Sequence, residues 1–113
     1  MHIPREEFER LVSEAVNGLP ADFREKIENV EVLVEEDHPQ GVPALGLYLG
    51  VPLTQRTYWA AHLLPDRITI FQRRIESRCS SYAEIVAEVR ETVLHEIAHH
   101  FGISDRRLEE LGR

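Results

Sequence analysis

The chain has 113 residues, and its 13 Lys and Arg against 20 Asp and Glu give a formal charge of -7 at pH 7. This length suits a single domain over residues 1–113 and excludes a second full domain. A hydrophobic content of 42% with 29% charged residues indicates a globular rather than a disordered chain. The acidic balance lacks the basic face that phosphate neutralisation requires, so we expect no nucleic-acid partner.

The single cysteine, Cys79, excludes an internal disulfide and permits a reducing compartment. The first ten residues are polar and acidic, unlike the basic and then apolar start of a targeting signal. No apolar segment approaches the length that spans a bilayer. Together these features predict a soluble, cytoplasmic protein without a membrane partner.

The first part of the chain predicts two helical segments and a strand. Residues 4–19 begin with a proline and repeat apolar residues at the i, i+3 and i+4 spacing of an amphipathic helix. A short helical piece is expected over 23–27. Valines alternate with other residues over 30–35, as in a half-buried strand. Turn-forming residues then predict a loop over 36–43.

The middle of the chain predicts two further strands. Leucines alternate with glycine and tyrosine over 45–50, which favours a strand. Residues 54–64 show no clear period and are expected to be irregular. After the turn signal at 65–66, we expect a strand over 67–72, with Gln72 on the same face as its isoleucines.

The longest predicted helix lies in the last third of the chain. Ser81 and Glu84 have the spacing of a capping box, and a long apolar stripe follows them. Gly102 is expected to end this helix because glycine tolerates a positive φ. Ser104 or Asp105 would then cap a last short helix.

The long helix contains His95-Glu96-Ile97-Ala98-His99, the HExxH pattern. Histidines four residues apart lie on one face of a helix, about 5–6 Å apart at Cβ, so both imidazoles can reach one Zn²⁺. Glu96 is rotated by about 100° from the first histidine, so its carboxylate can reach a water without displacing a ligand. It is therefore the candidate general base. The alternative is a solvated charged face with incidental histidines.

A catalytic zinc needs a third protein ligand and an open position for water, and few residues follow His99. Gly102 can turn the chain back toward the metal, where Asp105 would supply an oxygen ligand. The alternative is that Asp105 only caps the last helix. Glu109 and Glu110 are further candidates, ranked below Asp105.

Three segments, 45–54, 67–72 and above all HEIAHHFGISD at 95–105, resemble the small bacterial zincin-like metallopeptidases, which have a minimal zincin fold. The resemblance implies an α+β fold: a small mixed β-sheet packed on an N-terminal helix and a long zinc-motif helix, with a short C-terminal helix. The family pattern HExxHxxGxxD implies one zinc per chain. It assigns the metal to His95, His99 and Asp105, with Glu96 catalytic. One departure from the related metzincins is the absence of a methionine turn, since the only methionine is Met1.

The other candidate residues receive structural interpretations. His100 points to the helix flank and is expected to pack or hydrogen-bond rather than bind the metal. Glu91 either accepts the second ring proton of His95 or lies on a solvated face. Cys79 has no partner in a CxxC motif and is expected to be inert. No spacing selects an oxyanion donor among the tyrosines, which are Tyr48, Tyr58 and Tyr82.

Two functions fit these residues. The first is a zinc metallopeptidase in which Glu96 takes a proton from a zinc-activated water and passes it to the leaving amine. A peptide or protein substrate would lie extended beside residues 68–71, a placement that the zincin resemblance implies. The second is a zinc-binding or protein-interaction module with little or no turnover. An intact Glu96 favours the peptidase, because a structural zinc site needs no base.

Overall fold

The computed structural model describes residues 1–27, 29–52, 54 and 65–110, with the backbone alone at 105, 108 and 109. Most of the stretch predicted to be irregular, together with Tyr58, therefore lies outside the described residues. The elements in chain order are α1 (Arg5–Asn17), α2 (Ala21–Lys26), β1 (Val30–Glu35), β2 (Gly46–Leu49), β3 (Asp66–Phe71), α3 (Gln72–Ser77), α4 (Tyr82–His100) and α5 (Asp105–Glu110).

The three described strands form one mixed sheet in the order β1-β3-β2. β1 pairs parallel to β3, with Val32 opposite Ile68, and β2 pairs antiparallel to β3, with Tyr48 opposite the same Ile68. β3 is therefore central. The expectation that a substrate lies beside residues 68–71 is wrong, because neighbouring strands already occupy both edges of β3.

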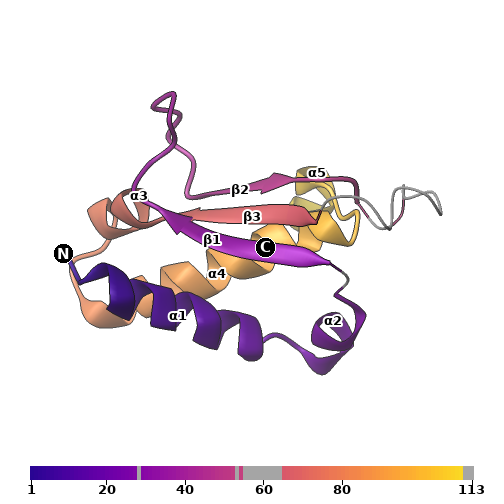
Figure 1. Cartoon of the computed structure of the whole chain (residues 1–113), viewed down its shortest axis with the longest axis horizontal. Coiled ribbons are helices and arrows are strands. Elements are labelled where there is room, and N and C mark those ends of the chain that lie inside the picture. The colour runs from indigo at the N-terminus through magenta and orange to yellow at the C-terminus, as the bar shows by residue number, and fades with distance from the viewer. Residues whose placement is uncertain (28, 53, 55–64, 111–113) are drawn as a thin grey trace.

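Both long helices, α1 and α4, cover the same face of this sheet (Figure 1). Valines of β1 and isoleucines of β3 point toward them at alternate positions, so one apolar core forms between the sheet and the helices. Each buried Val, Ile or Phe contributes about 1.5–3 kcal/mol of hydrophobic stabilisation. The completely buried apolar side chains are Phe8, Ile68, Ile70, Ile75, Ile85, Val89, Val93 and Ile97.

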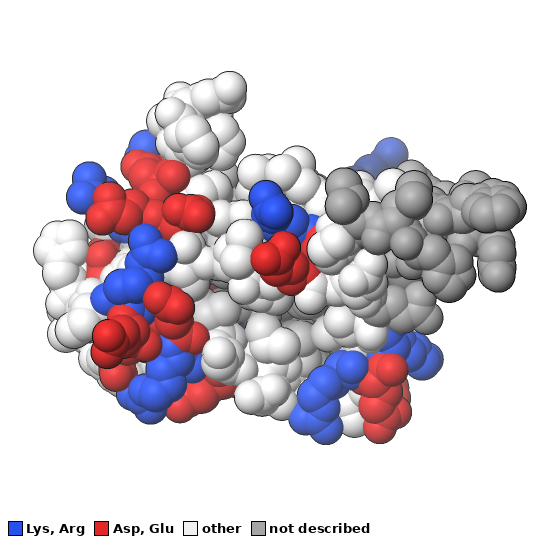
Figure 2. Space-filling view, viewed as in Figure 1, with Lys and Arg blue, Asp and Glu red and all other residues white. Residues whose placement is uncertain are grey.

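This arrangement confirms the predicted α+β architecture, with the long motif-bearing helix packed on a small mixed sheet. Figure 2 shows acidic and basic side chains interspersed on the face it presents. None of the described helices combines the length and the apolar character that crossing a membrane requires.

One helix was not expected from the sequence. The strand predicted over 67–72 ends at Phe71, because Gln72 begins α3. The side-chain amide of Gln72 donates to the Ile3 carbonyl at 2.9 Å and to Glu76 at 3.2 Å, so it joins α3 to the N-terminal segment. Six residues are too few to show a helical period in the sequence.

Glu76 on α3 is a buried carboxylate that holds this segment. Only 3% of the residue is exposed, and it accepts a hydrogen bond from the Ile3 amide at 2.8 Å. His2 Nδ1 lies 3.1 Å from the other carboxylate oxygen of Glu76. Burial by itself raises the pKa of Glu76, but the hydrogen bonds from Ile3, Gln72 and His2 outweigh it and hold the pKa below the ordinary value.

We expect Glu76→Gln to lower the free energy of unfolding at pH 7 by about 2 kcal/mol, because hydrogen bonds to a charged acceptor are lost. A carboxyl whose pKa is lowered by folding stabilises the protein fully above its ordinary pKa of 4.5, and this stabilisation is lost as the pH falls through the folded-state value. The difference in the free energy of unfolding between wild type and variant should therefore become smaller as the pH is lowered. Urea unfolding at pH 7 and pH 3 measures this difference, with the exposed Glu25→Gln as control. A gap independent of pH would contradict this account.

Candidate functional site

α4 carries the HExxH motif in its C-terminal half. The helix begins where the Ser81 side chain accepts a hydrogen bond from the Glu84 amide at 3.2 Å, as the capping box predicts. Ile97, inside the motif, is completely buried in the core between the helices and the sheet. Burial of Ile97 fixes the rotation of the helix, so the two motif histidines lie on a flank that is half-buried.

The rings of His95 and His99 lie close together on that flank. Their centroids are 5.0 Å apart, with 42° between the ring planes. Two imidazoles bound tetrahedrally to one zinc at about 2.1 Å would have their centroids about 5 Å apart. The spacing of the two rings therefore fits a shared zinc ion.

Glu96 lies between α4 and the edge strand β2, with only 6% of its surface exposed. Gly46 of β2 is directly against it: a Cβ added there would lie 3.1 Å from the Glu96 Cγ and 2.9 Å from the Thr92 Cγ2. A larger residue at 46 would push the strand or the glutamate away. The carboxylate is thus enclosed on the strand side by a backbone that only glycine allows so near.

A cavity of about 310 Å³ opens beside the motif between β2 and α4. Glu88 and Glu91 are among the residues that line it, and we call this side of the cavity the acidic wall. Arg78 is 3.9 Å from Glu88, while Glu91 is exposed to solvent. The lining residues are Leu45, Gly46, Glu88, Glu91, Thr92, His95 and Glu96.

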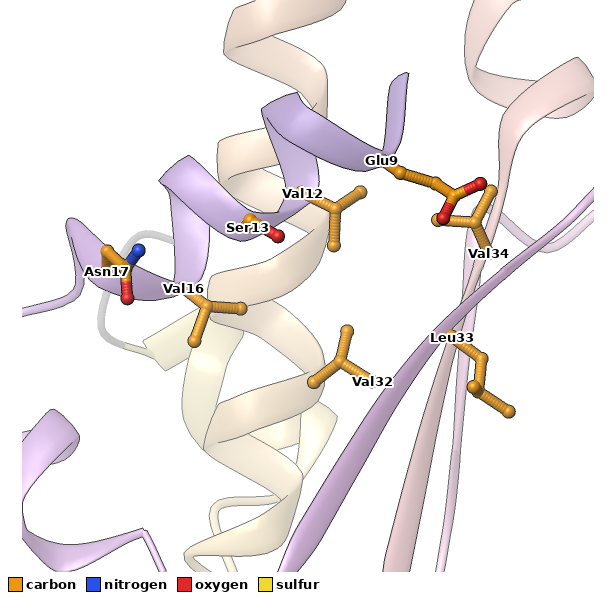
Figure 3. A pocket seen from close by; sticks show the side chains of 8 residues that line it. All are labelled: Glu9, Val12, Ser13, Val16, Asn17, Val32, Leu33 and Val34. Carbon is orange, nitrogen blue, oxygen red and sulfur yellow. The ribbon is translucent and has the colours of Figure 1, made fainter. Parts of the chain in front are cut away.

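A second cavity, of about 400 Å³, lies between α1 and β1 and shares no lining residue with the first. Figure 3 shows Val12 and Val16 of α1 turned toward Val32 of β1. Its lining residues include neither a histidine nor a cysteine. The cavity beside the motif is therefore the candidate active-site cavity.

The described side chains contain no group of three His, Cys, Asp or Glu that could hold a metal ion. The side chains of Asp105 and Glu109 lie outside the described part of the structure, so two candidates for the third ligand are not tested by it. Glu110 is paired with Arg107 at 3.1 Å.

The end of α4 follows the prediction. Gly102 has a φ of 83° and ends the helix, and α5 begins at Asp105. Of the two predicted caps, Ser104 is the one that the structure shows: its hydroxyl accepts from the Arg107 amide at 3.2 Å.

Sequence reasoning missed a buried hydrogen-bonded cluster beside the motif. His100 is 0% exposed, and its Nδ1 lies 2.8 Å from Oδ2 of Asp66. The Tyr48 hydroxyl donates to the same oxygen at 2.5 Å. His100 was expected to pack or hydrogen-bond, and it does both. Asp66 was interpreted only as a turn residue, because its partners are distant in sequence.

The other sequence candidates lie away from the motif's chemistry. The Tyr82 hydroxyl donates to Glu7 at 2.6 Å near the start of α4, so it serves the contact between α4 and α1. Burial raises the pKa of the Cys79 thiol, in keeping with an inert cysteine.

A family model described as zincin-like metallopeptidase matches residues 25–113, a span that includes the sheet, the motif helix and the acidic cavity. A conserved hypothetical protein (TTHA0227) from Thermo thermophilus has a similar solved structure, with a TM-score of 0.59 and 30% sequence identity. That similarity covers 96% of this chain and 97% of the other. No curated protein matches significantly. By its motif, its fold and this match, the chain belongs to the zincin-like metallopeptidase family.

Proposed function

We propose that this protein is a zinc-dependent peptidase in which His95, His99 and Asp105 hold the metal and Glu96 is the general base. The observation that carries the proposal is the pair of motif rings 5.0 Å apart, next to a buried glutamate that faces an edge strand. Membership in a metallopeptidase family supports it. The Ser104 cap supports Asp105 as third ligand, because the last helix has its cap from another residue.

Zinc bound to these residues would supply a Lewis acid that acidifies a water and polarises the scissile carbonyl. Glu96 accepts the proton of that water as the hydroxyl adds to the carbonyl carbon. The same carboxyl then gives the proton to the amide nitrogen as the C–N bond breaks, so Glu96 leaves the cycle in its initial state. Its place between α4 and Gly46 restricts the carboxylate to the side of the motif that faces the cavity.

The substrate path follows from the strand order. β2 is an edge strand of the described sheet, and it borders the cavity that also touches His95 and Glu96. An extended peptide that adds to the outer edge of β2 passes over the motif. A side chain next to the scissile bond then enters the cavity with the acidic wall.

The first prediction separates metal binding from base catalysis. His95→Ala and His99→Ala should each abolish binding of one zinc per chain, because two remaining ligands cannot hold the ion. Glu96→Gln should keep zinc and lose nearly all peptidase activity. Elemental analysis and cleavage of a peptide library measure the two properties, with His38→Ala in the distant 36–43 loop as control. A Glu96→Gln protein that cleaves as fast as wild type would indicate a zinc-binding module without this chemistry, or another base.

The second prediction assigns the third ligand by a matched pair at neighbouring positions. Asp105→Ala should weaken zinc binding by more than about tenfold, because losing an outer partner of a ligand already costs about that much. Ser104→Ala should lower the free energy of unfolding by about 1 kcal/mol through the lost cap. It should leave zinc affinity within about twofold of wild type. Competition titration with a chelator measures both variants, and wild-type affinity in Asp105→Ala would move the third position to another residue.

The third prediction concerns specificity. The carboxylates of Glu88 and Glu91 favour peptides with Lys or Arg next to the cleaved bond. Glu91→Gln should reduce the preference for basic over neutral residues up to about fivefold, the value of one exposed charge pair. Cleavage-site profiling of a peptide library measures the ratio, with the exposed Glu14→Gln on α1 as control. An unchanged ratio of cleavage next to basic and neutral residues would show that Glu91 takes no part in substrate recognition.

A further inference from the structure

The buried carboxylate of Asp66, 3% exposed, joins the edge strand to the end of the motif helix. Its Oδ2 lies 2.8 Å from Nδ1 of His100, the last residue of α4. Because an ionised carboxylate only accepts hydrogen bonds, the ring nitrogen is the donor. From the β2 side, the Tyr48 hydroxyl donates to the same Oδ2, and the Val51 amide donates to Oδ1 at 3.3 Å.

Tyr48 also contacts the proposed metal ligand itself. Its ring stands edge-on to the His99 ring, with centroids 6.2 Å apart and 74° between the planes. The His100 ring lies at 6.4 Å from the same tyrosine, at 62°. The tyrosine thus touches two consecutive histidines, one proposed to bind metal and one bonded to Asp66.

We propose that Tyr48, Asp66 and His100 are positioning residues that hold His99 in its metal-binding place before the metal arrives. The inference rests on the proposed zinc site and adds residues that are not ligands. It assigns to the cluster a role in metal affinity, beyond the stability that any buried hydrogen bond provides.

The physical reason lies in the position of His99 on the helix. The last turn of a helix opens most easily, because no further turn follows it. In α4 the amides of residues 101–103 cap the carbonyls of residues 97–99, but these bonds do not fix the direction of the side chains. His95 lies one turn deeper, so the separation of 5.0 Å between the two rings depends on the order of the final turn. The bond from His100 to Asp66 ties that turn to β3, and the Tyr48 ring packs against His99 from β2. A ligand ordered in advance spares the metal the entropy cost of ordering it.

The test compares two variants of the cluster with a matched core variant. Tyr48→Phe removes one hydroxyl and keeps the ring, and Asp66→Asn keeps the shape and removes the charge. Val89→Ala removes buried volume from α4 without touching the cluster. Chelator competition gives the zinc affinity of each full-length protein, and urea unfolding of the metal-free protein gives its stability.

We expect both cluster variants to bind zinc about tenfold to 100-fold more weakly than wild type. Val89→Ala should lose at least as much stability as Tyr48→Phe while keeping the wild-type zinc affinity. Amide hydrogen exchange at His99 and His100 of the metal-free protein should also become faster in the cluster variants, at least about tenfold. If Asp66→Asn does not fold, Tyr48→Phe alone decides the matter.

Wild-type zinc affinity in Tyr48→Phe, or equal loss of affinity in Val89→Ala, would overturn the positioning role and leave the zinc site intact. A wild-type protein that binds no zinc would overturn the proposed function and this inference together. The two failures are therefore distinguishable in one set of titrations.

Discussion

The structure depends on one buried carboxylate. Asp66 stands at the start of the central strand, and donors reach it from β2 and from the end of α4. Burying a charged carboxylate is costly unless several hydrogen bonds satisfy it, so these elements must meet at the same point. Gly50 allows the chain after β2 to approach Asp66 this closely, since a side chain at that position would overlap the Asp66 carboxylate. The arrangement of strand, sheet and helix around the motif follows from this requirement.

The position of β2 in turn determines the surroundings of the proposed base. With the Tyr48 hydroxyl bonded to Asp66, β2 brings Gly46 so near α4 that an added Cβ would lie 2.9 Å from Thr92 Cγ2 and 3.1 Å from Glu96 Cγ. A buried glutamate with a backbone on one side and a cavity on the other has one direction in which to meet a water. The proposed zinc-binding pair needs only a helix, whereas the surroundings of the proposed base need the sheet as well.

The parts of this structure that depend on neighbours in sequence could be predicted, and the parts that depend on distant pairing could not. The apolar period of α1 and the alternation of β1 indicated both elements, and the motif spacing indicated the rings that lie 5.0 Å apart. No local pattern marks β3 as central, so the expected substrate edge was misplaced. Asp66 and His100 are 34 positions apart, and a short turn signal concealed the role of the aspartate. The sequence offers Ser104 and Asp105 alike as the cap of the last helix; the Ser104 hydroxyl accepts from the Arg107 amide, and the Asp105 side chain lies outside the described residues.

The parallel pairing of β1 and β3 sets the order in which the site can be assembled during synthesis. Val30 lies opposite Asp66, so this ladder closes a long loop and has to wait for β3 to leave the ribosome. The motif helix emerges later still, and its turns form within microseconds. The sheet and α4 share one apolar core, so the sheet becomes stable only when the motif helix packs on it. The flank that carries the two motif histidines is therefore completed in the same step as the core.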